Sequence, residues 1–173
     1  MNTYPVSGSF TDISVTDYYA DVQFRVSRDG AVSVVTRDAE DVTHTVRVEG
    51  NTLTVTRPEP TAGQRLFHHE DDDPEVTIYL PAGNYGALTV SNSSGDIESA
   101  AQLGFASANL TTVSGDIDLN GSVGGKVVCN TTSGDVELRS PTIGDVEINT
   151  TSGDAELNDS YIQSLKVVSV SGD

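Results

Sequence analysis

Acidic side chains recur at regular intervals along the second half of this sequence, and their types and spacing are the ones best suited to chemistry. They belong to a Ser-Gly-Asp triplet that begins at Ser94, Ser114, Ser133, Ser152 and Ser171. Regularly spaced carboxylates attract cations, and calcium prefers such oxygen ligands. The triplet is therefore either a repeated cation site or the mark of a repeated structural unit.

Two acidic columns follow the serines, one two residues later and the other four residues later. Because side chains alternate between the faces of a strand, both columns are expected on one outer face. The predicted acidic face, a candidate binding surface, consists of Asp96, Glu98, Asp116, Asp118, Asp135, Glu137, Asp154 and Glu156.

This acidic face has two interpretations. Calcium-binding β-rolls repeat a Gly-Gly-x-Gly-x-Asp pattern about every nine residues, and the pattern does not occur in this sequence. Exposed carboxylates about 5 Å apart repel one another only weakly, so the face also suits a general attraction to cations or to a basic partner. We expect no cofactor and no catalytic or metal-ligating residue, with calcium binding as the alternative.

The glycines of the triplets are expected to be structural. They fall between the inward positions of two strands, where the chain turns a corner and glycine lets neighbouring backbones approach closely. A small polar column two residues before each serine, which includes Thr112 and Thr131, is expected to lean inward beside this corner. The predicted turn glycines are Gly95, Gly115, Gly134, Gly153 and Gly172.

Apolar columns indicate the elements that position these residues. Each repeat has apolar residues at alternating positions before the serine, such as Val127 and Cys129, and after it, such as Val136 and Leu138. Two inward-facing strands per nineteen residues predict a parallel β-helix, or solenoid, with coils about 4.8 Å apart. Cys129 is expected to be a small buried hydrophobe and not a reactive thiol.

The first half of the chain has a different pattern. Short alternating runs from about Thr11 to Leu80 are separated by turn sequences such as Ser-Arg-Asp-Gly and Glu-Gly-Asn, which predict antiparallel hairpins. We therefore expect an all-β protein in which a β-rich region, residues 1–84, caps the solenoid of residues 85–173.

A cluster of histidines and acids interrupts this first half. His68 and His69 adjoin Glu70–Asp73, and imidazole and carboxylate groups are ligands for transition metals or calcium. Adjacent side chains in an extended loop point in opposite directions, however, and no second cluster completes a coordination sphere. We expect a solvated acidic loop.

Charge and composition exclude several partners. The 173 residues carry a formal net charge of -17, and the nine Lys and Arg residues are scattered singly, so nucleic acid and anionic membrane surfaces should repel the chain. The sequence has no run of 18 apolar residues and no signal-peptide pattern, which predicts no direct membrane insertion. The protein is then either cytoplasmic or exported by a signal missing from this sequence.

Catalysis has weak support in the sequence. All three histidines precede the repeats, so no motif indicates a Ser-His-Asp arrangement. Polysaccharide lyases and hydrolases also use parallel β-helices, but they carry unrepeated carboxylate or basic clusters on long loops, and the loops here are short. We expect a non-enzymatic protein, with a polysaccharide-acting enzyme as the alternative.

Three features resemble a known family: the segment "GNTLTVTR" (Gly50–Arg57), the segment "VTIYLPAGNYGALTVSNSSGDIES" (Val76–Ser99), and the "TTSGDVEL" repeats. Together they resemble the bacterial putative-adhesin domain family of unknown function, from about Phe10 to Asp173. The resemblance implies a parallel β-helix in a cell-surface or envelope-associated protein. It supplies no catalytic residues.

The last residue, Asp173, ends a triplet where another strand would be expected, so we expect the repeats to be truncated here or covered by a partner. An open strand edge invites pairing, which predicts self-association through the C-terminal coil. The sequence as a whole predicts an extracytoplasmic scaffold module that presents its acidic face to a protein or glycan partner.

Overall fold

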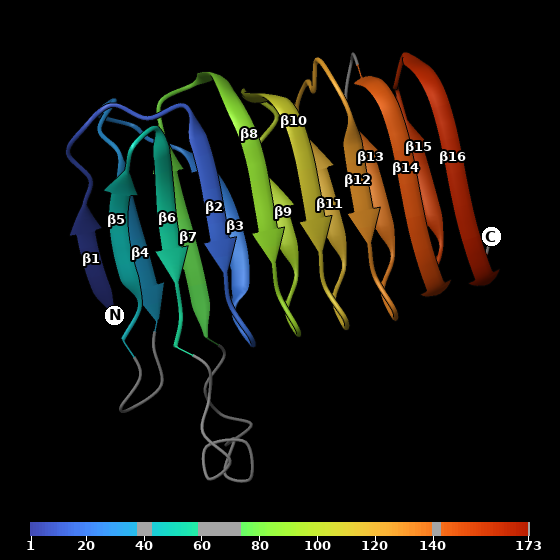
Figure 1. Ribbon diagram of the computed structural model, residues 1–173, viewed down its shortest axis with the longest axis horizontal. Helices are drawn as coiled ribbons and strands as arrows, with labels where there is room; N and C mark the ends of the chain where they lie inside the picture. The colour runs from blue at the N-terminus through green and yellow to red at the C-terminus, as the bar shows by residue number, and fades with distance from the viewer. Residues whose placement is uncertain (38–42, 59–73, 140–142, 173) are drawn as a thin grey trace, which may run out of the picture.

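The computed structural model describes residues 1–37, 43–58, 74–139 and 143–172. Within these ranges the chain forms sixteen strands and no helix, which confirms the all-β prediction. Figure 1 shows two facing sheets of eight strands each that run along an elongated stack. The predicted acidic loop with His68, His69 and Glu70–Asp73 lies outside the described residues.

Successive strands along the chain mostly alternate between the two sheets. The first sheet contains, in spatial order, β1 (Asn2–Pro5), β4 (Ser33–Arg37), β7 (Glu75–Leu80), β3 (Asp21–Val26), β9 (Ile97–Ser99), β11 (Ile117–Asn120), β13 (Val136–Arg139) and β15 (Ala155–Asn158). The second sheet contains β16 (Ile162–Ser171), β14 (Ile143–Ser152), β12 (Val127–Asn130), β10 (Leu103–Thr111), β8 (Gly83–Ser91), β2 (Asp12–Thr16), β6 (Thr52–Thr56) and β5 (Thr45–Glu49).

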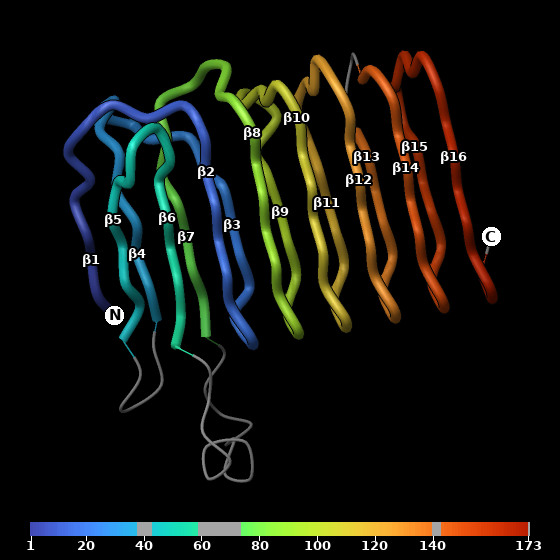
Figure 2. The backbone as a smooth tube through the Cα atoms, in the orientation of Figure 1, coloured from blue at the N-terminus to red at the C-terminus, as the bar shows by residue number. Residues whose placement is uncertain are grey.

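From β8 onward the strands of each sheet pair in parallel and in a constant register. Leu88 pairs with Ala108, Ala108 with Val127, and Val127 with Val146, so the partners are 20, 19 and 19 residues apart. The backbone tube in Figure 2 shows the resulting regular stack. Like positions of successive repeats therefore lie over one another, and their side chains form rows along the stack.

The N-terminal strands continue this stack, and only some of them form hairpins. β2 and β3 pair in parallel with β8 and β9 on one side and with β6 and β7 on the other. The hairpin predicted at Ser-Arg-Asp-Gly is wrong, because β7 lies between β3 and β4 and pairs with both. The hairpin predicted at Glu-Gly-Asn is confirmed: β5 and β6 are antiparallel, with Gly50 at a φ of +58°.

Aliphatic columns fill the space between the sheets. Val136 and Leu138 are fully buried, as are the corresponding residues of the preceding coil. Cys129 is also fully buried, and burial raises the pKa of its thiol to about 12, which makes it the buried hydrophobe that we expected. In the edge strand β16 the side chains of the same columns are exposed, and Leu165 is 51% exposed.

Candidate functional site

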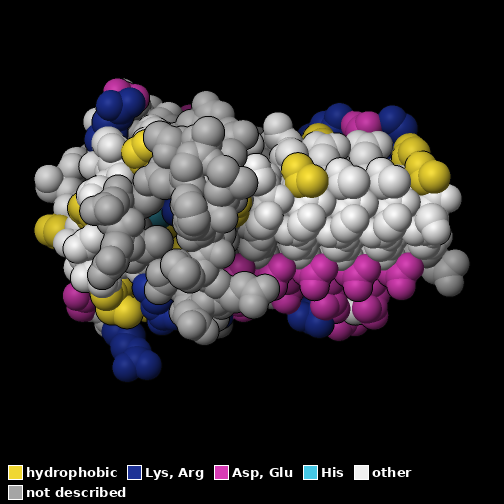
Figure 3. All heavy atoms as spheres, turned by 90° about the horizontal axis from the view of Figure 1, so that it is seen from below, with side chains coloured by type: hydrophobic (Ala, Val, Ile, Leu, Met, Phe, Trp, Pro, Cys, Tyr) yellow, Lys and Arg dark blue, Asp and Glu magenta, His cyan; other side chains and the backbone are white. Residues whose placement is uncertain are grey.

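The predicted acidic face lies on the outer surface of the first sheet. Its second column, four residues after each serine, projects from β9, β11, β13 and β15. There Glu98 pairs with Asp118, Asp118 with Glu137, and Glu137 with Glu156. Its first column comes directly before each of these strands. A row of acidic side chains runs along the repeats in the space-filling view (Figure 3). Parallel stacking in constant register thus brings all four repeats' carboxylates together.

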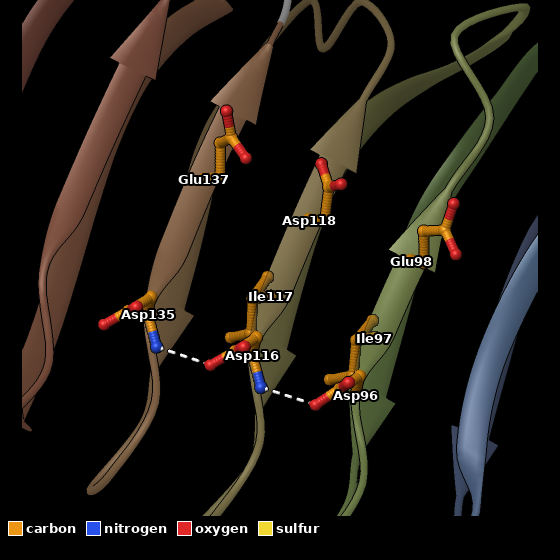
Figure 4. A pocket seen from close by; sticks show the side chains of 8 residues that line it. All are labelled: Asp96, Ile97, Glu98, Asp116, Ile117, Asp118, Asp135 and Glu137. Atoms are coloured by element: carbon orange, nitrogen blue, oxygen red, sulfur yellow. Dashed lines mark hydrogen bonds between the residues drawn. The ribbon is translucent and has the colours of Figure 1, made fainter.

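Each aspartate of the first column accepts a hydrogen bond from the next coil. The backbone N–H of Asp116 donates to Asp96 Oδ1 over 2.8 Å, that of Asp135 to Asp116 Oδ1 over 2.7 Å, and that of Asp154 to Asp135 Oδ1 over 2.8 Å (Figure 4). We call this arrangement the aspartate ladder. One carboxylate oxygen of Asp96, Asp116 and Asp135 is therefore structural, and the other oxygen is left for solvent or a partner.

The ladder extends to a residue that the repeat pattern did not indicate. Asp21, at the start of β3, accepts a hydrogen bond from the backbone N–H of Asp96 over 2.9 Å. Asp21 lies 75 residues before Asp96 and belongs to no Ser-Gly-Asp triplet. Its only sequence signal is its place directly before the inward-facing Val22. In the repeats, too, an aspartate directly precedes an inward-facing apolar residue.

A shallow groove of about 330 Å³ lies between the two acidic columns. Figure 4 shows the side chains that line it, and Ile97 and Ile117 contribute the apolar part of the lining. Desolvation in this groove, together with the neighbouring Glu137 and Glu98, raises the pKa of Asp118, although Arg139 acts in the opposite direction. The carboxylates that line the groove are Asp96, Glu98, Asp116, Asp118, Asp135 and Glu137.

Two arginines already bind to the second acidic column. Arg25 on β3 donates from both terminal nitrogens to Glu98, over 2.9 and 2.8 Å. Arg139 on β13 lies 3.4 Å from Asp118 and 2.5 Å from Glu137. Planar guanidinium groups therefore fit the spacing of this column, as expected for bidentate pairing with carboxylates.

The glycines of the triplets lie where neighbouring coils come closest together. A Cβ atom added at Gly134 would overlap the carbonyl oxygen of Gly115, and one added at Gly115 would overlap that of Gly95. The polar column beside this corner is buried, and the hydroxyl groups of Thr112 and Thr131 donate to the carbonyls of Gly95 and Gly115 over 3.5 and 3.4 Å. The triplet's glycine thus has a structural role.

A buried ionic cluster lies in the N-terminal coils, and the sequence analysis did not identify it. Asp17 accepts hydrogen bonds from the backbone N–H groups of Tyr18, Tyr19 and Ala20. Its other carboxylate oxygen lies 2.5 Å from His44 Nε2, and Arg57 Nη1 is 3.6 Å from Asp17 Oδ1. The three side chains are at most 6% exposed. The isolated residues carry no sequence signal, because they come from three separate segments.

The outer surface of the second sheet carries a separate charged group. Lys126, directly before β12, and Lys166 of β16 each donate to Glu147 of β14, over 2.8 and 2.7 Å. These hydrogen bonds lower the pKa of Glu147 to about 2. Charges of both signs alternate here, in contrast to the acidic face, so this surface offers a cationic partner less net attraction.

The described residues contain no group of three or more His, Cys, Asp and Glu side chains arranged to hold a metal ion. They also contain no helix long and apolar enough to cross a membrane. The carboxylates of the acidic face are spread along successive coils and do not surround one point.

One family and several solved structures are similar to this chain. The sequence pattern of the Toastrack DUF4097 family matches residues 10–173. A "putative cell adhesion protein" from Clostridium sporogenes ATCC 15579 aligns with 10% identity over 99% of this chain and 98% of its own, with a TM-score of 0.52. That score shows a shared fold.

Two further structures align over similar lengths with lower scores. A "putative adhesin" from Bacteroides fragilis NCTC 9343 has 14% identity over 99% of this chain and 94% of its own, with a TM-score of 0.38. A "putative lipid binding protein" from Parabacteroides distasonis ATCC 8503 has 15% identity over 98% and 94%, with a TM-score of 0.34. No curated protein sequence matches the chain.

Proposed function

The chain belongs to the Toastrack DUF4097 family, and from this premise we propose that it is a non-enzymatic, adhesin-like scaffold module at the cell surface or envelope. In this proposal the acidic face binds a cationic protein partner. The observation that carries the proposal is the groove between two acidic columns, which six carboxylates line on one outer surface. The shared fold with a protein described as a "putative cell adhesion protein" agrees with this role.

The chemistry of the acidic face favours a partner rich in arginine. Arg25 and Arg139 occupy parts of the second column, but each neutralises only one charge in a chain with a net charge of -17. The second carboxylate oxygens of Asp96, Asp116 and Asp135 lie beside them along the same groove. A basic segment laid along this row would gain further guanidinium–carboxylate pairs, and the protein's negative field would speed its approach.

The proposed architecture is a solenoid of nineteen-residue coils that antiparallel strands cap at its N-terminal end. The 19-residue offset between β10, β12, β14 and β16 supports the coil length. The antiparallel pairs β1–β4, β4–β7 and β5–β6 lie together at one end of the two sheets, which supports a cap.

Calorimetric titration with a nona-arginine peptide tests the proposed function. The variant Glu98→Gln/Asp118→Asn/Glu137→Gln removes three charges from the second column and leaves the aspartate ladder intact. The matched control Glu49→Gln/Asp145→Asn/Asp159→Asn removes three charges elsewhere. We expect the first variant to weaken binding by about tenfold or more and the control by less than about threefold.

Equal losses in both variants would show that the peptide senses only the net charge, and the proposed face would then be wrong. Calcium, titrated in the peptide's place, tests the alternative of a calcium-dependent module. A melting shift at about 1 mM calcium that the first variant abolishes would favour that alternative. Turnover in a screen of cell-wall and plant glycans would overturn the non-enzymatic assignment.

Self-association through β16 is a second part of the proposal. Leu165, Val167 and Val170 are exposed on this edge strand, at 51%, 41% and 78%. Because an open edge with apolar side chains pairs readily with another strand, we expect concentration-dependent dimers in sedimentation velocity. Val167→Lys should yield monomers, whereas Val113→Lys, at an exposed corner, should not. A wild-type chain that stays monomeric at high concentration would contradict this part.

A further inference from the structure

A hollow of about 530 Å³ lies on the outer surface of the first sheet, apart from the groove of the acidic face. It forms because β7 lies between β3 and β4, so the connection between these two strands must pass over the end of β7. Its volume falls within the range of about 300–1,000 Å³ that is typical of small-molecule sites. The residues that line it are Val26, Ser27, Arg28, Asp29, Ser33 and Tyr79.

The strand pairing sets the position of Tyr79, the aromatic residue that lines this hollow. Tyr79 lies on β7 between Arg25 of β3 and Ser33 of β4, and its half-buried position on β7 alternates with the buried Ile78 and Leu80. Tyr79 makes no ring contact with another aromatic residue in the part of the chain that the structure describes.

The connection that crosses β7 is held in place by its own hydrogen bonds. The backbone N–H of Ser27 donates to the carbonyl of Leu80 over 2.8 Å, and the backbone N–H of Ala31 donates to Asp29 Oδ1 over 3.0 Å. Gly30 supplies the positive φ, +74°, that the turn requires. Arg28 and Asp29 are thus presented on a short, defined turn.

The polar groups of the hollow include both donors and acceptors. The Ser27 hydroxyl oxygen is buried and has no hydrogen-bond partner among the described residues. Arg28 offers a fork of donors, and the second carboxylate oxygen of Asp29 remains an acceptor. An aromatic face next to such groups suits a pyranose ring, which has an apolar C–H face and hydroxyl groups around its edge.

We propose that this hollow is a subsite for one pyranose ring of a neutral oligosaccharide. The ring stacks on Tyr79, and its hydroxyl groups exchange hydrogen bonds with Arg28 and Asp29. A neutral ring is favoured because a net charge of -17 disfavours uronic acids and sulfated sugars. This site is separate from the proposed function of the acidic face, since none of its lining residues belongs to that face.

NMR titration of the full chain with N-acetylchitotriose, cellotriose and maltotriose tests the proposal. We expect at least one trisaccharide to shift the amide signals of residues 26–33 and 79, with a dissociation constant of about 1 mM. Tyr79→Ala should weaken binding by about tenfold or more, whereas Tyr79→Phe, which keeps the ring face, should change it by less than about threefold.

Two further variants keep the test decisive if Tyr79→Ala does not fold. Arg28→Ala changes an exposed turn residue and should weaken binding, whereas Tyr161→Ala, at an exposed tyrosine on the last coil, should leave it unchanged. The acidic-face variant described above should also bind the sugar normally. Absence of shifts at 10 mM of every trisaccharide, or displacement of a bound sugar by inorganic phosphate, would overturn the proposal.

Discussion

Asp17 shows how one residue can join segments that the repeat pattern does not connect. It lies directly after β2, while Arg57 follows β6 and His44 precedes β5. By the register of β2 with β6 and β8, Asp17 and Arg57 occupy the same inward column as Asn92 and the buried threonines of later coils. The column is therefore polar along its length, with an ionic pair at its N-terminal end.

Substitution of Asp17 should destabilise the fold strongly. Asp17→Ala leaves Arg57 and His44 buried without their counter-ion and frees three backbone N–H groups, and we expect a loss of about 3–5 kcal/mol in the free energy of unfolding. Denaturant titration measures this loss, with Asp145→Asn on the exposed outer surface as the control. A loss below about 1 kcal/mol would mean that the cluster adds little to stability.

Stability should also fall at acid pH because of the same residue. Desolvation alone raises the pKa of Asp17, but the hydrogen bonds from His44, Tyr19 and Ala20 outweigh it and lower the pKa below its usual value. A lowered pKa stabilises the folded state above the unfolded pKa of about 3.9, and this contribution is lost as the pH falls through the folded pKa. Asp17→Asn should therefore unfold with a weaker pH dependence below about pH 4. An unchanged acid profile would contradict this assignment.

The repeating structural element of this protein is the Ser-Gly-Asp corner between two strands. At these corners glycine permits close backbone contact and aspartate joins one coil to the next. The hydroxyl groups of Thr112 and Thr131 bond to glycine carbonyls at two of the corners, whereas that of Thr150 has no hydrogen-bond partner among the described residues. The glycine and aspartate contacts repeat at the same place in successive coils, so the corners form a continuous hydrogen-bonded edge. The edge fixes the register of the strands that follow it.

Gly134→Ala should disturb this corner. The added methyl group would overlap the Gly115 carbonyl, and the φ of +155° at Gly134 is unfavourable for alanine. We expect a loss of about 2–4 kcal/mol in the free energy of unfolding. Gly124→Ala is the matched control, because nothing lies within 4 Å of the added Cβ and its φ is ordinary. Equal melting temperatures for the two variants would refute the close-approach argument.

At the scale of the whole molecule, parallel stacking concentrates negative charge on one side. The acidic face lies along the repeats of the first sheet, while Lys126, Glu147 and Lys166 form a mixed group on the second. Successive carboxylates are separated by about one coil, 4.8 Å, and they repel one another in dilute buffer. The buried core and the aspartate ladder therefore stabilise the stack against the repulsion between these carboxylates.

Stability should therefore increase with ionic strength. The Debye length falls from about 10 Å at 0.1 M salt to about 3 Å at 1 M, which is shorter than the spacing between coils. We expect the melting temperature to rise by about 2–4 °C or more over this range. In Asp96→Asn/Asp116→Asn/Asp135→Asn, which keeps an acceptor oxygen at each ladder position, the rise should shrink. The control variant Glu49→Gln/Asp145→Asn/Asp159→Asn should show the same rise in melting temperature as the wild type. An equally reduced rise in both variants would argue against repulsion between the stacked carboxylates.

The sequence by itself determined the all-β class, the alternation that buries Cys129 and its neighbours, and the rows of acids on one face. These features depend on local periodicity: a side-chain period of two and a repeat of nineteen residues are visible wherever the pattern recurs. Only the tertiary structure decided that β7 lies between β3 and β4, that Asp21 begins the aspartate ladder, and that Asp17, His44 and Arg57 meet. These contacts join segments up to 75 residues apart that share no repeat, and strand order between such segments depends on the packing of the whole core, which no local pattern encodes.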